Sequence, residues 1–203
     1  VFSLRSNASF GIGDFGDLKK VIDWIAATNQ RVLQVLPIND TTITHTWTDS
    51  YPYSCISIFA LHPQYADLTL LPKIKDAKKC AEFESLRIQL NAFAQIDYEK
   101  VNDAKTKYLH EIYLQEGKKI FDSAEFKKFF VESESWLVPY AQYSFLRDKN
   151  STADFSKWNG HAAWNEADRK ALSTSGSKEY KEVEFFYFVQ YILNSQMEAV
   201  HKY

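Results

Sequence analysis

A short apolar run near the start of the chain limits the folds open to it. Residues 31–38 are mostly apolar and end in turn residues, which is typical of a strand buried on both faces of a parallel sheet. Residues 1–5 form a further short strand candidate. Between the two, apolar side chains recur at the spacing of an amphipathic helix, namely Leu18, Val21, Ile22 and Ile25. Strand, helix and strand within the first 38 residues predict a βαβ unit.

The remainder of the chain has a helical pattern and few strand signals. We predict four helices here, with Pro139 in the first turn of the last, where proline is tolerated: 73–95, 98–117, 123–133 and 136–148. A final helix over 179–203 has a broad apolar stripe, which needs a sheet or other helices to cover it. Because only two convincing strands are present, we expect an incomplete domain with three parts, 1–65, 66–178 and 179–203.

The composition argues against several classes of function. The chain has 203 residues and a formal net charge of −2, which offers no electrostatic basis for binding nucleic acid or an anionic membrane. No apolar run approaches the ~20 residues that span a bilayer, and no signal peptide opens the chain, so we expect a cytoplasmic protein. Cys55 and Cys80 cannot form a disulfide framework, and the histidines lack metal-ligand spacing. We therefore predict no metal and no cofactor.

A glycine-rich stretch from Gly11 to Gly16 has the Gly-x-Gly-x-x-Gly spacing of dinucleotide-binding loops. However, Asp14 and Phe15 lie where a phosphate would have to approach, and the aspartate would repel it. Asp14 or Gly16 can satisfy the free N–H groups at the start of a helix. The stretch therefore predicts a structural turn that leads into the first helix.

The segment from Asp49 to Pro63 is the most informative for function, because it combines aromatic and polar residues after the end of a predicted strand. Loops in that position carry the active site in parallel barrels. Its tyrosines could stack on a sugar ring while its polar groups bind hydroxyls. Alternatively, the segment is a proline-fixed turn whose tyrosines pack down onto the barrel. The residues alone leave both interpretations open.

Five motifs resemble one protein family in order and spacing. They are Ser3 to Ser6, Gly11 to Leu18, Asp23-Trp24, Leu33 to Thr41 and Asp49 to Pro63. The family is the 4-α-glucanotransferases of glycoside hydrolase family 77, also called amylomaltases or disproportionating enzymes. The sequences Leu-Pro-Ile-Asn-Asp-Thr and Asp-Ser-Tyr-Pro-Tyr-Ser are most similar to its plant cytosolic type. Two later segments resemble the family more loosely, Trp136 to Ala141 and Phe188 to Tyr191.

The resemblance implies an α/β fold, a partial (β/α)8 TIM barrel with a mainly helical insertion subdomain. Residues 1–65 would be the first βαβ part with the substrate loop, 66–178 the insertion and 179–203 a barrel helix, with the remainder of the barrel absent. It also implies a retaining transferase that moves α-1,4-glucan units from maltodextrin to a glucan acceptor. The family's catalytic Asp and Glu residues belong to later strands, so no catalytic residue is assigned within this chain.

The resemblance also implies which residues bind substrate. Tyr53 matches the tyrosine that lines the subsite of the donor sugar, and Tyr51, Ser50 and Asp49 share its loop. Two other classes of function remain open. A non-catalytic carbohydrate-binding module would suit the aromatic content of 16%, although such modules are usually all-β. A helical interaction domain would dock partners through its aromatic C-terminal helix.

Overall fold

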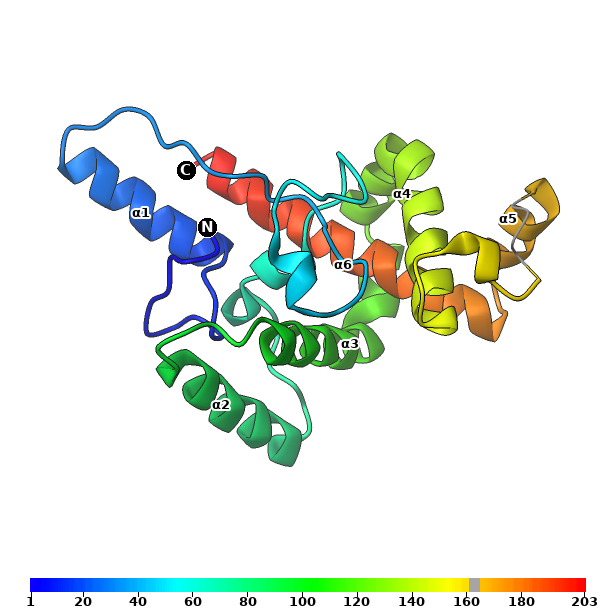
Figure 1. The fold of residues 1–203 in the computed structure, drawn as a ribbon, viewed down its shortest axis with the longest axis horizontal. Helices are drawn as coiled ribbons and strands as arrows, with labels where there is room; N and C mark the ends of the chain where they lie inside the picture. The colour runs from blue at the N-terminus through cyan, green and yellow to red at the C-terminus, as the bar shows by residue number, and fades with distance from the viewer. Residues whose placement is uncertain (161–164) are drawn as a thin grey trace.

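The fold is built mainly from helices in the computed structural model, which describes residues 1–160 and 165–203 (Figure 1). The α-helices of this described part are α1 (Phe15–Ala27), α2 (Ala77–Ala92), α3 (Tyr98–Asp122), α4 (Ala124–Asn150), α5 (Glu166–Leu172) and α6 (Lys178–His201). Short 3₁₀ helices interrupt the connections: η1 (Trp47–Ser50), η2 (Pro63–Tyr65), η3 (Leu68–Leu70) and η4 (Phe155–Lys157).

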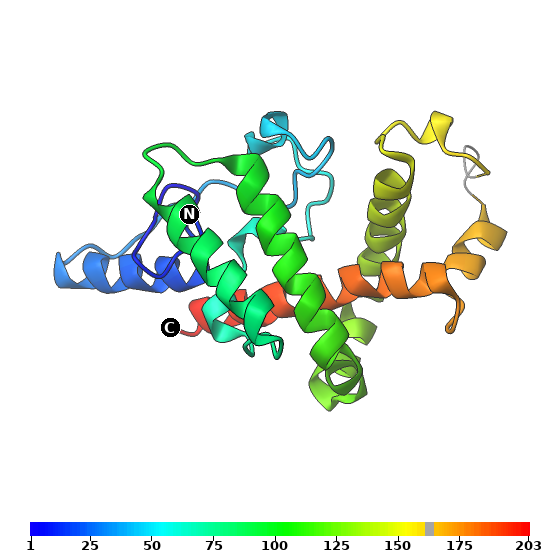
Figure 2. The same cartoon turned by 90° about the horizontal axis from the view of Figure 1, so that it is seen from below.

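Helix α6 is the central element, because most of the other helices pack against it. It contacts α1, α3, α4, α5 and η2 along its length. Figures 1 and 2 show α1 and the chain terminus at one end of α6 and α5 at the other, with α3 and α4 crossing it between them. Tyr203, just beyond α6, donates a hydrogen bond of 2.8 Å to Asp23 of α1. The two ends of the chain are therefore held at the same side of the molecule.

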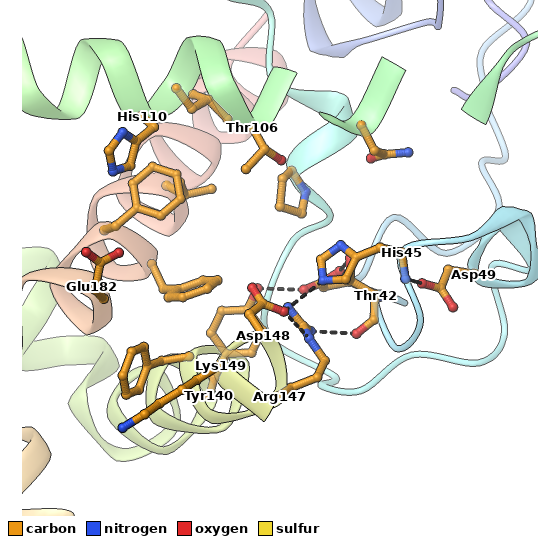
Figure 3. A pocket seen from close by; sticks show the side chains of 18 of the residues that line it. Thr42, His45, Asp49, Thr106, His110, Tyr140, Arg147, Asp148, Lys149 and Glu182 are labelled. Atoms are coloured by element: carbon orange, nitrogen blue, oxygen red, sulfur yellow. Dashed lines mark hydrogen bonds and ion pairs between the residues drawn. The ribbon is translucent and has the colours of Figure 1, made fainter. Parts of the chain in front are cut away.

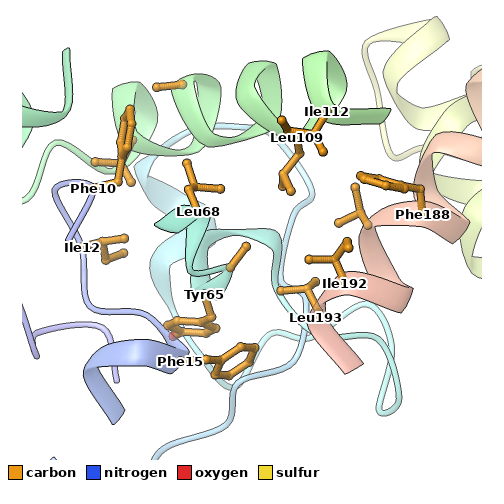
Figure 4. Packing of buried hydrophobic residues seen from close by; sticks show 14 of the residues in the cluster. Phe10, Ile12, Phe15, Tyr65, Leu68, Leu109, Ile112, Phe188, Ile192 and Leu193 are labelled. Carbon is orange, nitrogen blue, oxygen red and sulfur yellow. The ribbon is translucent and has the colours of Figure 1, made fainter. Parts of the chain in front are cut away.

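Two clusters of buried apolar side chains lie on either side of α6. The larger joins α1, α3, α6 and the segment around η2, and Figure 4 shows its members pointing toward one another; they include Ile12, Phe15, Tyr65, Leu109, Phe188 and Leu193. The second joins α4, α5 and α6 and includes Phe126, Leu137, Phe145, Trp158 and Val183. Burial of these side chains is the main force that holds the helices together.

The start of α1 confirms the structural turn predicted for the glycine-rich stretch. The carboxylate of Asp14 accepts hydrogen bonds from the N–H groups of Gly16 and Asp17 and so caps the helix. Gly13 passes so close to the backbone that an added Cβ would lie 2.2 Å from the carbonyl oxygen of Val1 and 2.5 Å from that of Leu4. The glycine is needed here for close approach of two chain segments.

The predicted strands do not form, and the α/β partial (β/α)8 barrel is therefore wrong for the chain as the structure describes it. Residues 1–5 and 31–38 contain no strand, and the described residues hold one isolated antiparallel bridge, between Asn39 and Leu61. A strand requires a neighbour to satisfy its backbone groups. Residues 31–38 have none: Val32, for example, is 81% exposed. The segment remains extended but unpaired, and the observed architecture is helical.

The helical predictions agree better with the structure. Helix α3 and helix α6 confirm the predictions over 98–117 and 179–203, and α2 is slightly shorter than the predicted 73–95. The separate helices over 123–133 and 136–148 are wrong, because α4 is continuous and Pro139 lies inside it. Apolar residues on both sides of the proline pack into one cluster, and their burial outweighs the ~3 kcal/mol that an interior proline costs a helix. The division of the chain at 65 and 178 stays a prediction.

Across the described residues, no helix combines the length and the apolar character that crossing a membrane requires.

Candidate substrate loop and its supports

The segment between Ile38 and His62 forms a loop whose two ends are joined by backbone hydrogen bonds. Asp40 N–H donates to the carbonyl of Ala60 at 2.9 Å, and His62 N–H donates to that of Ile38 at 3.0 Å. The side-chain amide of Gln190 on α6 then binds Leu61 through both of its polar atoms: its oxygen accepts from the Leu61 N–H at 2.9 Å, and its nitrogen donates to the Leu61 carbonyl at 2.8 Å. The base of the loop is therefore fixed to α6.

Asp49, one of the predicted substrate-binding residues, organises the interior of the loop. Its side chain is buried, and its carboxylate accepts backbone N–H hydrogen bonds from Ile43, Thr44 and His45 at 3.0, 2.8 and 2.7 Å. The Thr44 hydroxyl donates to the same carboxylate at 2.9 Å. Three backbone donors converging on one anion give the loop a defined shape without regular secondary structure.

The other predicted residues lie at the surface of the same loop. Tyr51 and Tyr53 are 59% and 60% exposed, and their ring centroids are 5.6 Å apart at an interplanar angle of 50°. Ser50 is half-buried beside them. The two tyrosines therefore do not pack against the helical core of this chain. They present a pair of adjacent aromatic rings to solvent.

Helix α4 supports the loop through three polar residues on one side. Tyr140 donates from its hydroxyl to the carboxylate of Asp40 at 2.6 Å, and Arg147 donates to the carbonyl of Thr42 at 2.6 Å. Asp148 is hydrogen-bonded to His45 Nε2 at 2.7 Å and accepts from Arg147 Nε at 2.7 Å. These contacts join the loop to α4 at three successive points.

Burial and charge reinforce this support. Burial, together with the neighbouring Asp40 carboxylate, raises the pKa of Tyr140 well above its usual value, so the phenol remains a hydrogen-bond donor. Although burial works in the opposite direction, the hydrogen bonds from His45 and Arg147 lower the pKa of Asp148. Asp148 is thus an anion beside the buried Arg147 guanidinium, which is 3% exposed and needs a counter-charge.

Helix α3 closes the opposite side of the loop. His62 is buried and its Nδ1 accepts from Gln64 N–H at 3.2 Å, which leaves Nε2 to donate to the Tyr98 hydroxyl at 2.9 Å. Burial lowers the pKa of His62 and favours this neutral form. Glu99 accepts a hydrogen bond of 3.0 Å from the backbone N–H of Trp47. His62 therefore acts within the scaffold of the loop.

A cavity of about 580 Å³ opens between the loop, α3, α4 and α6. Figure 3 shows His45, Asp148 and Arg147 at one side of this cavity, and Glu182 and His110 at the other. Aromatic and aliphatic side chains form much of its wall, among them Leu109, Phe145, Phe185, Phe186 and Val189. Tyr51 and Tyr53 are not among the residues that line it. In the described part of the chain, no cluster of three or more His, Cys, Asp or Glu side chains could hold a metal ion.

Sequence reasoning missed the α4 residues that support the loop. Arg147 and Asp148 contact loop residues 105 and 103 positions away, and no local pattern indicates such a contact. Tyr140 and Gln190 did lie within segments that resemble a known family, and the structure places both at the base of the loop.

Comparison with known proteins identifies the family of the whole chain. The family described as 4-alpha-glucanotransferase matches residues 1–203, which is the whole chain. The chain belongs to the 4-alpha-glucanotransferase family. Relatives in this family include 4-alpha-glucanotransferase DPE2 of Oryza sativa subsp. japonica, which is 36% identical over 203 residues. The 4-alpha-glucanotransferase of Chlamydia trachomatis serovar D is 31% identical over 205 residues.

The structure also resembles a solved member of this group of enzymes. The crystal structure of amylomaltase from Corynebacterium glutamicum matches all of this chain with a TM-score of 0.75 at 19% sequence identity, and the match covers 27% of that chain. The chain likewise spans 21% of the rice 4-alpha-glucanotransferase and 37% of the chlamydial one. It corresponds to a minor part of the length of these relatives.

Proposed function

We propose that this chain is the substrate-loop portion of a 4-α-glucanotransferase, a transferase that moves glucosyl or maltooligosyl units from maltodextrin to a glucan acceptor. The observation that carries the proposal is the family match across residues 1–203. The exposed tyrosine pair supports it, because aromatic faces suit the apolar face of a pyranose ring while neighbouring polar groups bind its hydroxyls.

Within the loop we assign different roles to the four candidate residues. Tyr53 contacts the donor sugar, and Tyr51 extends the aromatic surface beside it. Ser50, half-buried next to Tyr51, offers a hydroxyl that can both donate to and accept from a sugar. Asp49 contributes indirectly, because its carboxylate is occupied by the backbone of the loop. Its binding role is to hold the tyrosines in place.

The chemistry we propose for the whole protein is a retaining double displacement. A carboxylate attacks the anomeric carbon while a carboxylic acid, about 5–5.5 Å away, protonates the departing glucan. The hydroxyl of an acceptor glucan then attacks the anomeric carbon of the covalent intermediate and releases the enzyme carboxylate, while the second carboxyl group acts as the base that takes the hydroxyl proton. Transfer wins over hydrolysis when a bound acceptor and an enclosed site keep water away from the intermediate. We place neither carboxyl group in this chain.

Product analysis tests the proposal directly. A protein that contains this chain and has the length of its relatives is incubated with maltotriose, with and without glycogen, and the products are separated by size. Free glucose with a matching gain of longer chains supports transfer. Glucose without chain lengthening would indicate hydrolysis, and no turnover at all would refute the proposal. The purified 203-residue chain serves as the control and is expected to be inactive.

A further inference from the structure

We propose that His45 and Asp148 form a latch that positions the tyrosine pair for the donor sugar. The proposal rests on the function proposed above and adds two positioning residues to it. The latch joins the loop to α4 through the hydrogen bond between His45 Nε2 and Asp148 Oδ1, which is 2.7 Å long. Neither residue needs to contact the substrate for this role.

Two hydrogen bonds and a short stretch of backbone connect the latch to the tyrosine pair. The His45 ring is bound to Asp148, and the backbone N–H of His45 donates to the carboxylate of Asp49 at 2.7 Å. Asp49 belongs to η1, which ends at Ser50, and Tyr51 follows directly. A displacement of the His45 backbone would therefore move the carboxylate of Asp49, and with it the short helix η1 that ends directly before Tyr51.

The backbone conformation of His45 is held by hydrogen bonds to its neighbours. Its φ is +59°, in the left-handed region, which is uncommon for residues other than glycine, although asparagine, aspartate and histidine occur there more often than most. Such a conformation persists where surrounding contacts outweigh its cost. Here those contacts are Asp49 on the backbone and Asp148 on the ring. Removing the contact on the ring leaves the loop with less to hold this conformation.

On the α4 side of the latch Asp148 is held by its neighbour Arg147, whereas the contact with His45 itself is partly exposed. Arg147 is buried and binds both Asp148 and the carbonyl of Thr42, so Asp148 is fixed in orientation. The side chains of His45 and Asp148 retain 57% and 38% of their exposure. A partly exposed contact of this kind is of modest strength, which lets it tune the loop without being required for folding.

Steady-state kinetics on the full-length protein test the latch. The central variant is His45→Asn, because asparagine tolerates the left-handed backbone but is too short to reach Asp148. We expect KM for maltotriose to rise roughly two- to five-fold, as for loss of a partly exposed polar contact, with a smaller change in kcat. Asp148→Ala should act in the same direction. Asp148→Asn keeps an oxygen that accepts from both His45 and Arg147 but removes the counter-charge of Arg147, so its KM should lie between those of wild type and Asp148→Ala.

A matched control lies one residue away. Lys149 forms an ion pair of 2.5 Å with Glu179 on α6 and has no hydrogen bond to the loop in the described structure. Lys149→Met therefore removes a charged contact from the same turn of α4 and should leave KM unchanged. Hydrogen exchange gives a readout without substrate: His45→Asn should speed exchange at the amides of Ile43 and Thr44, which bind Asp49.

The outcomes separate the latch from the proposed function. If His45→Asn is folded and its KM is unchanged while Tyr53→Ala raises KM, the latch is refuted and the function stands. If Asp148→Asn is as impaired as Asp148→Ala, the hydrogen bond is not what positions the loop, and the latch is also refuted. A wild-type protein without any transfer would overturn the proposed function itself, and the positioning role with it.

Discussion

The phenol of Tyr140 donates a hydrogen bond of 2.6 Å to the carboxylate of Asp40, and both side chains are buried. The two residues are 100 positions apart in the sequence. Tyr140 also accepts a hydrogen bond of 3.2 Å from Gln190, so α4, α6 and the base of the loop meet at one hydroxyl. This contact ties the stability of the helical scaffold to the shape of the candidate substrate loop.

Tyr140→Phe is expected to destabilise the protein by about 1–3 kcal/mol, because one buried carboxylate oxygen of Asp40 loses its donor and the buried amide of Gln190 loses one of its two acceptors. Urea unfolding followed by circular dichroism measures the change. Tyr143→Phe is the matched control on the same helix: its ring packs against Trp158, and its hydroxyl is not the donor to Asp40. Equal stability of the Tyr140 variant and wild type would mean that the hydroxyl contributes nothing net.

Tyr53→Ala is expected to weaken use of the donor sugar several-fold or more, since aromatic stacking contributes about 0.5–1.5 kcal/mol beyond the area that it buries. The quantity to measure is kcat/KM for maltotriose in the full-length protein. Tyr53→Phe keeps the ring and should retain most of the activity. A folded Tyr53→Ala variant with unchanged kinetics would remove this residue from the site.

Asp14 should make stability fall as pH rises. Burial raises the pKa of this carboxyl from 3.8 to about 6, outweighing the opposite effect of nearby Lys105. The folded state therefore holds the proton more tightly than the unfolded state, and the stability that Asp14 contributes is complete below 3.8 and is lost as pH rises through about 6. Asp14→Asn keeps the helix cap but cannot ionise.

The wild type and this variant should therefore differ in their pH profiles. Urea unfolding across that pH range should show the stability of wild type falling relative to Asp14→Asn. Carboxyl groups that do not interact with Asp14 titrate alike in both proteins, so the difference reports on Asp14 together with its neighbours Asp17 and Asp67. Parallel profiles would mean that the pKa of Asp14 in the folded protein is the ordinary value of an aspartate.

Gly13→Ala is expected to cost several kcal/mol, because the new Cβ would overlap the carbonyl oxygens of Val1 and Leu4 at 2.2 and 2.5 Å. Backbone has to move to relieve such a contact. Ala26→Gly in α1 offers a comparison of opposite chemistry, with an expected loss of about 1 kcal/mol from helix propensity alone. Thermal unfolding would rank the two, and a Gly13 variant as stable as wild type would contradict the observed close approach.

The sequence predicted the helices well where local signals agree with burial. Helix α6 has a serine cap at Ser177 and a long apolar stripe, and both its range and its central position could be expected. The strand predicted over residues 31–38 is wrong because local signals do not decide its structure. An apolar run forms a strand only if a partner strand lies beside it, and a single segment does not reveal its partners. Pro139 was misread because tertiary burial overrode its local effect.

The candidate site divides in the same way. Tyr51 and Tyr53 lie in a distinctive segment and are predicted from it as substrate-binding residues, whereas no local pattern indicates the α4 residues that support their loop. The contact of His45 with Asp148 depends on how α4 packs against the loop, and the two residues are 103 positions apart. Asp49 was predicted as part of the substrate loop, but its position inside the loop follows from a backbone turn that the residue types alone do not specify.

Gln190 and Gln196 of α6 carry a consequence for how the protein is made. Each binds the N–H and C=O of one residue, Leu61 and Asp67 respectively, and each pair is separated by 129 positions. At a synthesis rate of about 5–20 residues per second, the ribosome adds α6 roughly 6 to 26 seconds after it adds residues 61–67. During that interval water has to satisfy these backbone groups. The loop between Ile38 and His62 therefore acquires its final contacts only after Gln190 of α6 has been synthesised.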